Sequence, residues 1–375
     1  MDYIPDRMDD PQVVQDALEK QERVRNWLSK VGADGLVVSR RDQFAWLTSG
    51  GDNRVLNNTE NGFGHLVITT SGKQYLVAQS MDATRLLEEQ VPNQGFELVP
   101  LHWFEEDPHQ QAYKLAGQRV VADTALAGAQ EVNSTLAYLH YPLTKLELDR
   151  SRWLGQKVAE LLEKVAQTVV PGQTEQDIAI QLNCEAVRWG IDLDVLIVGS
   201  DERIFKYRHP LPTLKPVKNY VLLHPAARKW GLHANVSRSL HFGVAPREIQ
   251  RAYQAVATIE AYIFASLKAG LSFAKLFEMQ KSWYAEVGFP SEWQNHYMGG
   301  PTGYLVVDTN RNQTETCLQK NQAFDWFVTV TGAKVEELSL LTDSGFELAS
   351  RGSIWPGIEV STAQGSVEVP GLWIR

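Results

Sequence analysis

The sequence is poor in cysteine, and its two cysteines, Cys184 and Cys317, lie far apart in the chain. Two distant thiols indicate neither a disulfide framework nor a clustered thiolate metal site. Such a composition fits a reducing compartment, and we expect the protein in the cytoplasm. The opening segment "MDYIPDRMDDPQVVQ" has no basic stretch followed by an apolar one, and no long apolar run occurs anywhere. We therefore expect no export signal and no membrane span.

Positive charge is also scarce. Lysine and arginine total 36 against 45 aspartates and glutamates, which gives a net charge of −9. This balance excludes the basic footprint of most nucleic-acid-binding proteins and gives no attraction to an anionic membrane. We expect a small-molecule or short-peptide substrate as the partner. A chain of 375 residues with 43% hydrophobic residues can fill the cores of two ordinary domains.

The first part of the chain, residues 1–145, has the pattern of an α/β domain. "QVVQDALEKQERVRNWLSKVG" carries apolar residues at helical spacing, and "ADGLVVSR" and "FAWLTSG" have the short apolar character of strands. "HLVITTSGKQYLVAQ" places Ser71-Gly72 between two apolar runs, which indicates a hairpin. Alternating helix and strand signals then continue through "RVVADT".

The second part, residues 146–375, contains an internal repeat. Residues 158–190 and 256–288 both have the pattern helix, glycine, hydroxyl N-cap, helix, glycine, and eighteen residues separate the two glycines in each copy. Thr174 and Ser272 lie at corresponding N-cap positions. The repeat predicts two equivalent helix pairs.

Each helix pair precedes a β-rich segment, residues 193–242 after the first copy and residues 293–350 after the second. Two such halves in tandem predict an α+β domain with an approximate twofold axis, in which helices cover one face of a shared antiparallel sheet. The uncovered face is the expected cleft.

This organisation resembles the pita-bread family, which includes creatinase, aminopeptidase P, prolidase and methionine aminopeptidase. "RIFKYRHPLPTLKPVKNYVLL" resembles the family's His-x-x-Pro segment and places His209 and Pro212 in it. "NHYMGGPTGY" and "VTGAKVEELSLLT" fall where two later motifs are expected. The resemblance implies a creatinase-N-like domain over residues 1–145 and a pita-bread domain over residues 146–375. It also implies a homodimer, with "RRDQFAWLTSGGDNRV" near the second subunit's cleft.

The family's metallopeptidases use five metal ligands, and the resemblance allows each position to be compared. The five positions fall on His224, Asn235, Gly300, Phe327 and Glu336, the fourth with an uncertainty of about one residue. A two-metal site needs several oxygen or imidazole donors with bridging carboxylates, and this set has one carboxylate. We therefore expect no metal and no other cofactor. One zinc ion held by His224, His233 and Glu336 stays open as an alternative.

Residues 224–240 have the pattern of a hairpin. A turn centred on Lys229-Trp230 would set His224 opposite Asn235, with His233 and Ser237 on the same face. Arg238 would point to the other face and make a structural salt bridge.

Creatinase hydrolyses its substrate without metal and resembles this chain in the histidine of the His-x-x-Pro segment. The resemblance implies catalytic roles for His209, as general base, and for Glu336. Substrate-binding roles are expected for four further residues: His224, Asn235, His296 and Glu337. Structural roles stay open for these residues, such as a loop hydrogen bond by His209.

The predicted function is metal-independent hydrolysis of a C–N bond in a small amino-acid or peptide-like substrate. The alternative is a non-catalytic pseudopeptidase that binds a ligand or a protein.

Overall fold

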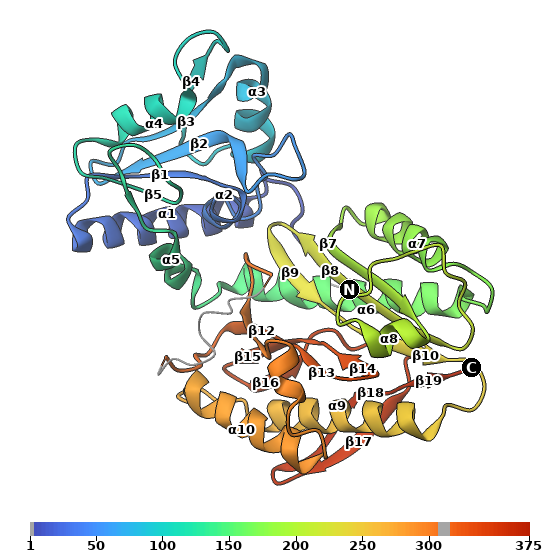
Figure 1. Cartoon of the computed structure of the whole chain (residues 1–375). Coiled ribbons are helices and arrows are strands. Elements are labelled where there is room, and N and C mark those ends of the chain that lie inside the picture. The colour runs from blue at the N-terminus through green and yellow to red at the C-terminus, as the bar shows by residue number, and fades with distance from the viewer. Residues whose placement is uncertain (1–3, 307–315) are drawn as a thin grey trace. The chain divides into compact units, whose positions relative to one another are not determined.

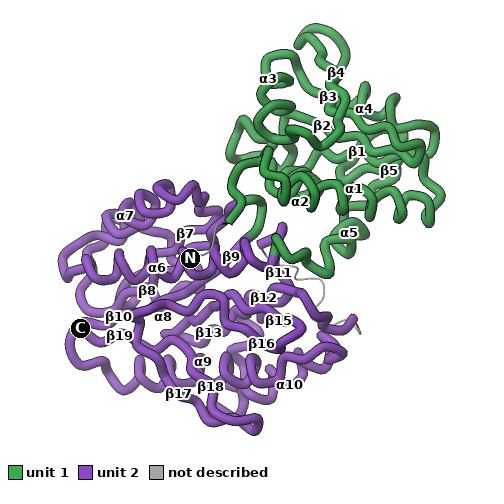
Figure 2. The backbone as a smooth tube through the Cα atoms, turned by 180° about the vertical axis from the view of Figure 1, so that it is seen from behind, with its two compact units in different colours: residues 1–147, 230–232 green, residues 148–229, 233–375 purple. Residues whose placement is uncertain are grey.

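The computed structural model describes residues 4–306 and 316–375, and the chain divides into two compact units (Figures 1 and 2). Unit 1 comprises residues 1–147 with residues 230–232, and unit 2 comprises residues 148–229 and 233–375. No helix in the described ranges combines the length and apolar character that a membrane crossing requires.

Unit 1 is built on a six-stranded sheet in the order β4-β3-β2-β1-β5-β6. Its strands are β1 (Gly35–Arg40), β2 (Asn61–Thr69), β3 (Gln74–Gln79), β4 (Glu97–Leu101), β5 (Val120–Ala122) and β6 (Gln130–Glu131). Its helices are α1 (Pro11–Val31), α2 (Arg41–Leu47), α3 (Ser80–Arg85), η1 (Leu86–Gln90), α4 (Pro108–Ala116), α5 (Asn133–Leu136) and η2 (Ala137–His140).

The expected hairpin is present, because β2 and β3 pair antiparallel across Ser71-Gly72. The α4 helix packs its small residues Ala112 and Ala116 against the strand residues Val37 and Val67. The prediction of a strand in "FAWLTSG" was wrong, since most of this segment lies in α2 and its apolar residues are buried. A short apolar run fits either a buried helix or a buried strand.

Unit 2 contains the long helices α6 (Lys145–Thr168, which begins at the end of unit 1), α7 (Glu175–Arg188), α9 (Arg247–Ser266) and α10 (Phe273–Glu286), and the short α8 (Glu202–Lys206) and η3 (Glu292–Asn295). Its first sheet has the order β19-β10-β8-β7, with β9 also paired to β8. Those strands are β7 (Asp192–Ser200), β8 (Tyr220–Lys229), β9 (Leu232–Asn235), β10 (Arg238–His241) and β19 (Trp373–Ile374).

The second half of unit 2 contributes a four-stranded sheet, β11-β12-β15-β16, and two hairpins. These strands are β11 (Gly299–Thr302), β12 (Gln322–Trp326), β13 (Val328–Val330), β14 (Ala333–Val335), β15 (Leu338–Thr342), β16 (Gly345–Leu348), β17 (Gly357–Thr362) and β18 (Gly365–Pro370). Helix α9 packs against both hairpins (Figure 1). A backbone hydrogen bond from Ser237 N to Glu336 O, 2.9 Å long, joins the two halves.

The two halves repeat each other in detail. Thr174 caps α7 and Ser272 caps α10, each accepting a backbone N–H at the third helical residue. Each cap residue also forms an isolated antiparallel bridge, to Pro216 in the first half and to Cys317 in the second. The repeat seen in the sequence therefore corresponds to a structural duplication.

Candidate functional site

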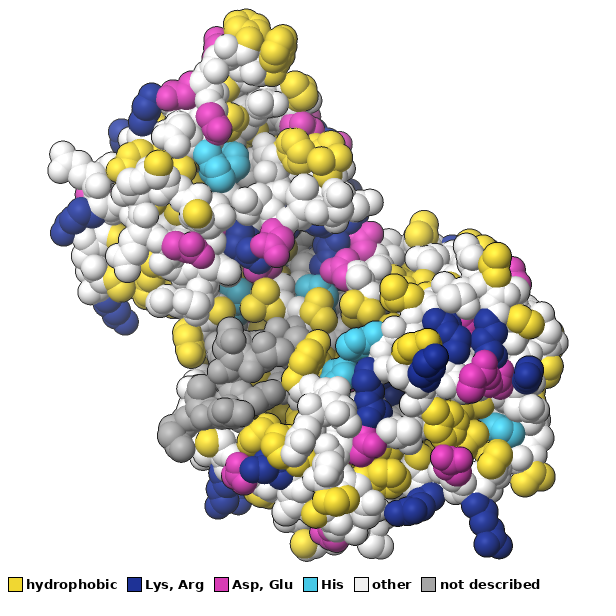
Figure 3. All heavy atoms as spheres, in the orientation of Figure 1, with side chains coloured by type: hydrophobic (Ala, Val, Ile, Leu, Met, Phe, Trp, Pro, Cys, Tyr) yellow, Lys and Arg dark blue, Asp and Glu magenta, His cyan; other side chains and the backbone are white. Residues whose placement is uncertain are grey.

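His209 and His296 lie in direct contact. His209 follows α8, and His296 directly follows η3. Their Nε2 atoms are 3.0 Å apart, and their ring planes form an angle of 65°. His209 is exposed and His296 is partly buried, and Figure 3 shows histidine side chains next to each other on this face of unit 2. The pair is therefore open to solvent on one side.

The hydrogen bonds of this pair fix its tautomers. His296 Nδ1 lies 2.7 Å from the Tyr297 carbonyl oxygen, which can only accept, so Nδ1 carries a proton. In a neutral ring the Nε2 atom of His296 is then the acceptor, and His209 donates through its own Nε2. The Nδ1 atom of His209 is left with a free lone pair, and no hydrogen bond to it occurs among the described residues.

Both rings are neutral at neutral pH. Partial burial, followed by the positive charge of Lys334, lowers the pKa of His209 below its usual range. The same two causes, in the same order, lower the pKa of His296 to about 4. His209 is consequently an unprotonated base whose available nitrogen is defined by its neighbour.

A second group lies deeper in the unit and consists of His224, Glu336 and Lys334. Lys334 Nζ is 2.7 Å from one oxygen of Glu336, and His224 Nδ1 is 3.3 Å from the other. The contact between His224 and Glu336 is not a hydrogen bond. The Ser237 hydroxyl lies nearer to the same Nδ1, at 3.0 Å. These side chains are almost fully buried, with 5% or less of each residue exposed.

Burial raises the pKa of Glu336 to about 7, although the ammonium group of Lys334 opposes the rise. Burial and the Lys334 charge also lower the pKa of His224 well below its usual range. The positive charge of Lys334 therefore lowers the pKa of His224 and of both His209 and His296.

The sequence analysis did not single out Lys334. The available signal was its position two residues before Glu336 on a strand, because alternate residues of a strand lie on one face. We call His209, His224, His296, Lys334 and Glu336 the histidine–lysine cluster.

Asn235 lies beside a buried aspartate that the sequence analysis also missed. Its backbone N–H donates to Asp325 Oδ2 at 3.3 Å, and its side-chain amide donates to the Val306 carbonyl at 3.1 Å. Burial, followed by the charge of Glu336, raises the pKa of Asp325 well above its usual range. Among the described residues, Asp325 Oδ1 has no hydrogen-bond partner.

Two of the family's ligand positions carry no donor side chain. Gly300 pairs with Asp325 across the strands β11 and β12. The ring of Phe327 packs against His296 and Tyr297, with centroids 5.9 and 5.5 Å apart. Phe327 therefore forms an apolar wall beside the exposed histidine pair.

Glu337 does not lie with the cluster. It forms a buried ion pair with Arg238 and accepts a 2.5 Å hydrogen bond from the Ser350 hydroxyl. Successive residues at the end of β14 point to opposite sides, so Glu336 faces His224 while Glu337 faces Arg238. The structure thus gives Glu337 a partner within the fold.

The hairpin turn is centred one residue later than the sequence indicated. Trp230 and Gly231 form the turn with positive φ angles of 54° and 78°. The register of β8 with β10, Arg238 opposite Leu223, places Ser237 rather than Asn235 across from His224. The expected partner of His224 was therefore wrong by two residues, because the αL turn with glycine second was not recognised.

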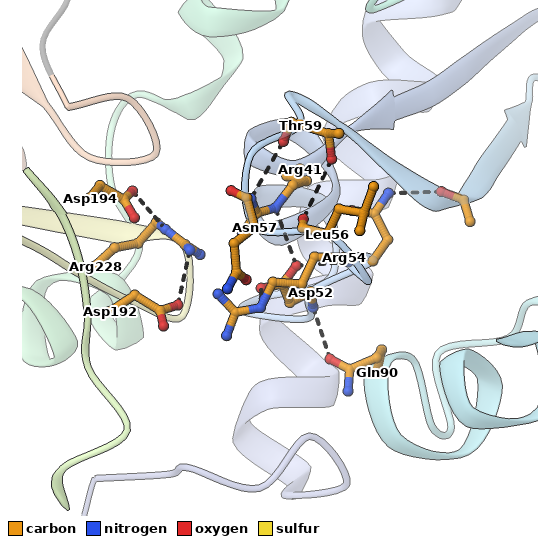
Figure 4. Close-up of polar contacts among 12 residues, drawn as sticks. Arg41, Asp52, Arg54, Leu56, Asn57, Thr59, Gln90, Asp192, Asp194 and Arg228 are labelled. Atoms are coloured by element: carbon orange, nitrogen blue, oxygen red, sulfur yellow. Dashed lines mark hydrogen bonds and ion pairs between the residues drawn. The ribbon is translucent and has the colours of Figure 1, made fainter. Parts of the chain in front are cut away.

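His233 is held away from the alternative zinc site. Its Nδ1 lies 2.8 Å from the Gly303 carbonyl, and its Nε2 lies 3.2 Å from Asp194. Asp194 and Asp192 both pair with Arg228, at 2.8 and 2.9 Å (Figure 4). Both ring nitrogens of His233 are thus used in bonds that do not include His224 or Glu336.

The donor set does not fit a divalent metal centre. Among the described residues, no group of three or more histidine, cysteine, aspartate or glutamate side chains is arranged to hold a metal ion. Glu336 is paired with a lysine, and a cation beside a carboxylate opposes the approach of a second cation. Burial raises the pKa of Asp325, the other nearby carboxyl group, and so disfavours the charged form that a metal ion requires.

Several solved structures have a fold similar to that of this chain. An Xaa-Pro dipeptidase from Bacillus anthracis has a TM-score of 0.74 at 16% identity, over 96% of this chain and 100% of that one. A dipeptidase from Mycobacterium ulcerans has a TM-score of 0.76 at 16% identity, and the match covers 96% of this chain and 98% of that one. The X-Pro aminopeptidase from Thermotoga maritima MSB8 has a TM-score of 0.73 at 16% identity, and the match covers 95% of this chain and 99% of that one.

These structural matches confirm the predicted fold class, the pita-bread fold preceded by a smaller α/β part. No curated protein matches the chain in sequence. The family model for metallopeptidase family M24 matches residues 150–343, more than half of the chain. The chain therefore belongs to metallopeptidase family M24.

Proposed function

We propose that this protein is a metal-independent hydrolase that cleaves a C–N bond in a small amino-acid or peptide-like substrate, with His209 as the general base. The observation that carries the proposal is the hydrogen bond between His209 and His296. It leaves the exposed imidazole with an unprotonated Nδ1, which a proton-accepting catalyst requires.

In the proposed reaction, His209 Nδ1 takes a proton from a water molecule while the water oxygen bonds to the substrate carbon. The resulting imidazolium then gives this proton to the leaving nitrogen as the C–N bond breaks. His296 is the positioning residue, because its Nε2 accepts the Nε2–H of His209 in both protonation states. The cycle returns His209 to its starting form and needs no further reactant.

Lys334 and Glu336 provide the charges around this base. The ammonium group of Lys334 is a fixed positive charge near three histidines, and Glu336 holds it at 2.7 Å. A buried cation in this place stabilises negative charge that develops on a substrate oxygen during attack. Glu336 therefore acts through Lys334 and His224.

The names of proteins with similar folds, together with the resemblance to creatinase, support the proposed substrate class. Two of these proteins are named as an Xaa-Pro dipeptidase and an X-Pro aminopeptidase, and we propose a related compound with an amide or guanidino C–N bond. The same proposal includes a cytoplasmic homodimer, in which units 1 and 2 correspond to the creatinase-N-like and pita-bread domains.

A non-catalytic pseudopeptidase is the second candidate. The observation in its favour is the pairing of Glu336 with Lys334, which removes the family's one matching acidic ligand from solvent. In that case the cluster binds a ligand and His209 contributes only a hydrogen bond.

The test is a turnover screen in EDTA with dipeptides that have proline second, creatine and related guanidino acids. The hydrolase predicts turnover that falls by about 10² to 10⁴ in His209→Ala while substrate binding is retained. Glu336→Gln should also lose activity, whereas His102→Ala, an exposed histidine of unit 1, should not. Turnover that persists in His209→Ala, or that requires added metal, would refute the role of His209. Binding of these compounds without turnover would favour the pseudopeptidase.

A further inference from the structure

A cavity of about 350 Å³ lies in unit 2 between two helices and a hairpin. It is lined by Tyr262 and Ser266 of α9, by Met279, Trp283 and Glu286 of α10, and by residues 361–364 at the turn of β17 and β18. Its size is at the lower end of the range for ligand-binding cavities, which suits a compact group of few atoms.

Two aromatic rings form one corner of this cavity. Tyr262 and Trp283 have ring centroids 5.8 Å apart with their planes at 67°. Both rings line the cavity, and the faces of aromatic rings carry negative electrostatic potential. The thioether of Met279 adds a polarizable surface. Such a corner favours a cation over a neutral group of the same shape.

A carboxylate lies beside the rings. Glu286 is exposed, and its Oε1 accepts a 3.2 Å hydrogen bond from the Tyr262 hydroxyl. No lysine, arginine or histidine lines the cavity, and among the described residues Glu286 has no ion-pair partner. Its negative charge is therefore uncompensated within the cavity.

We propose that this cavity binds a small organic cation, with a quaternary ammonium or guanidinium head against Tyr262 and Trp283 and its charge next to Glu286. The hydroxyl groups of Ser361 and Thr362 and the amide of Gln364 supply polar partners for a short polar tail. This site is separate from the histidine–lysine cluster, and no residue lines both.

The test compares choline with dimethylbutanol, its neutral carbon analogue, by NMR titration of the full chain. Choline should bind, and the neutral analogue should bind at least about threefold more weakly, because the cation–π and carboxylate attractions act only on a charge. Trp283→Leu and Glu286→Gln should each weaken choline binding about three- to tenfold. The far-ultraviolet spectrum should stay unchanged in both variants.

Glu278→Gln is the matched control, because Glu278 is an exposed residue of the same helix that pairs with Lys281. It should leave choline binding unchanged. The proposal is overturned if choline does not bind, if both compounds bind equally, or if either Trp283→Leu or Glu286→Gln retains the affinity of the parent chain. Turnover at the histidine–lysine cluster does not enter this result.

Discussion

At the scale of single residues, the tautomer of His209 is the feature on which the proposed chemistry depends. The chain of bonds from the Tyr297 carbonyl through His296 predicts that neutral His209 carries its proton on Nε2. Nitrogen-15 NMR of the imidazole rings measures this directly. A proton on Nδ1 of His209 at neutral pH would contradict the assignment, and His296→Phe should remove the preference.

Lys334 should set the pH dependence of the base. Because a nearby cation disfavours imidazolium, removing it in Lys334→Met raises the pKa of His209 from its lowered value towards 6.5. Activity requires neutral His209, so the acid limb of the rate profile should move to higher pH. Lys320→Met, which removes an exposed lysine paired with Asp343, should leave the limb in place. An acid limb that stays fixed or moves to lower pH in Lys334→Met would exclude this role.

The sequence could indicate His209 and His296 because both lie in short motifs with recognisable spacing. It could not indicate how Glu336 is paired, since that depends on which strand residues face each other in the folded unit. Asp325 was missed for the same reason. Glu337 looked equivalent to Glu336 in the sequence, and strand alternation separates them.

At the scale of elements, a buried ion pair fixes the end of β14 against β10. Arg238 pairs with Glu337 and also donates to the Ser350 carbonyl at 2.9 Å. Removing one partner leaves a buried charge without compensation, so Arg238→Met should lower the free energy of unfolding by about 3 to 5 kcal/mol. Urea unfolding measures the change. Arg351→Met, at an exposed pair with Glu368, should cost less than about 1 kcal/mol. Equal losses in the two variants would contradict the account.

Glu260, a residue of α9, should make stability depend on pH. Burial, followed by the charge of Glu337, raises its pKa well above 4.5 in the folded chain. The folded state therefore keeps a proton that the unfolded state loses, and stability falls as pH rises from about 4.5 towards the folded pKa. Glu260→Gln lacks this loss, so its stability relative to the parent chain should increase as pH rises above about 4.5. The exposed Glu278→Gln should show no such trend, and a constant difference for Glu260→Gln would contradict the pKa shift.

The helix caps could be predicted from the sequence. The helix in residues 44–47 and the residue opposite His224 could not. Thr174 and Ser272 are local signals, because an N-cap bonds to a residue only three positions away. The position of the turn at Trp230 could not be predicted in this way, because a positive φ is rare for tryptophan. A turn centred on Lys229-Trp230 was therefore expected in place of the observed turn at Trp230-Gly231. Shifting the turn by one residue changed which side chains lie opposite each other while keeping them on the same face.

At the scale of the whole molecule, the repeated glycine spacing indicated the duplicated architecture, and the structure shows it in both halves. The separation of the second half into one sheet and two hairpins was not visible in the sequence, because strand pairing between distant segments leaves no local pattern.

The proposed homodimer predicts a particle of about twice the 42.2 kDa chain mass in light scattering at micromolar concentration. Residues 40–55 are expected near the second subunit, and there Arg41 and Arg54 both pair with Asp52 inside unit 1 (Figure 4). A twofold interface should bury more than about 1,000 Å². A single species of 42.2 kDa would contradict the dimer.

We infer that this member of a metallopeptidase family has a site built around Lys334 and histidines in place of metal ligands. The most direct measurement is the metal content of the full chain after incubation with manganese, cobalt or zinc and removal of unbound ions. We expect no stoichiometric metal and a melting temperature that EDTA does not change, because the donor set of the described residues does not fit a divalent centre. Two tightly bound ions per chain would contradict it.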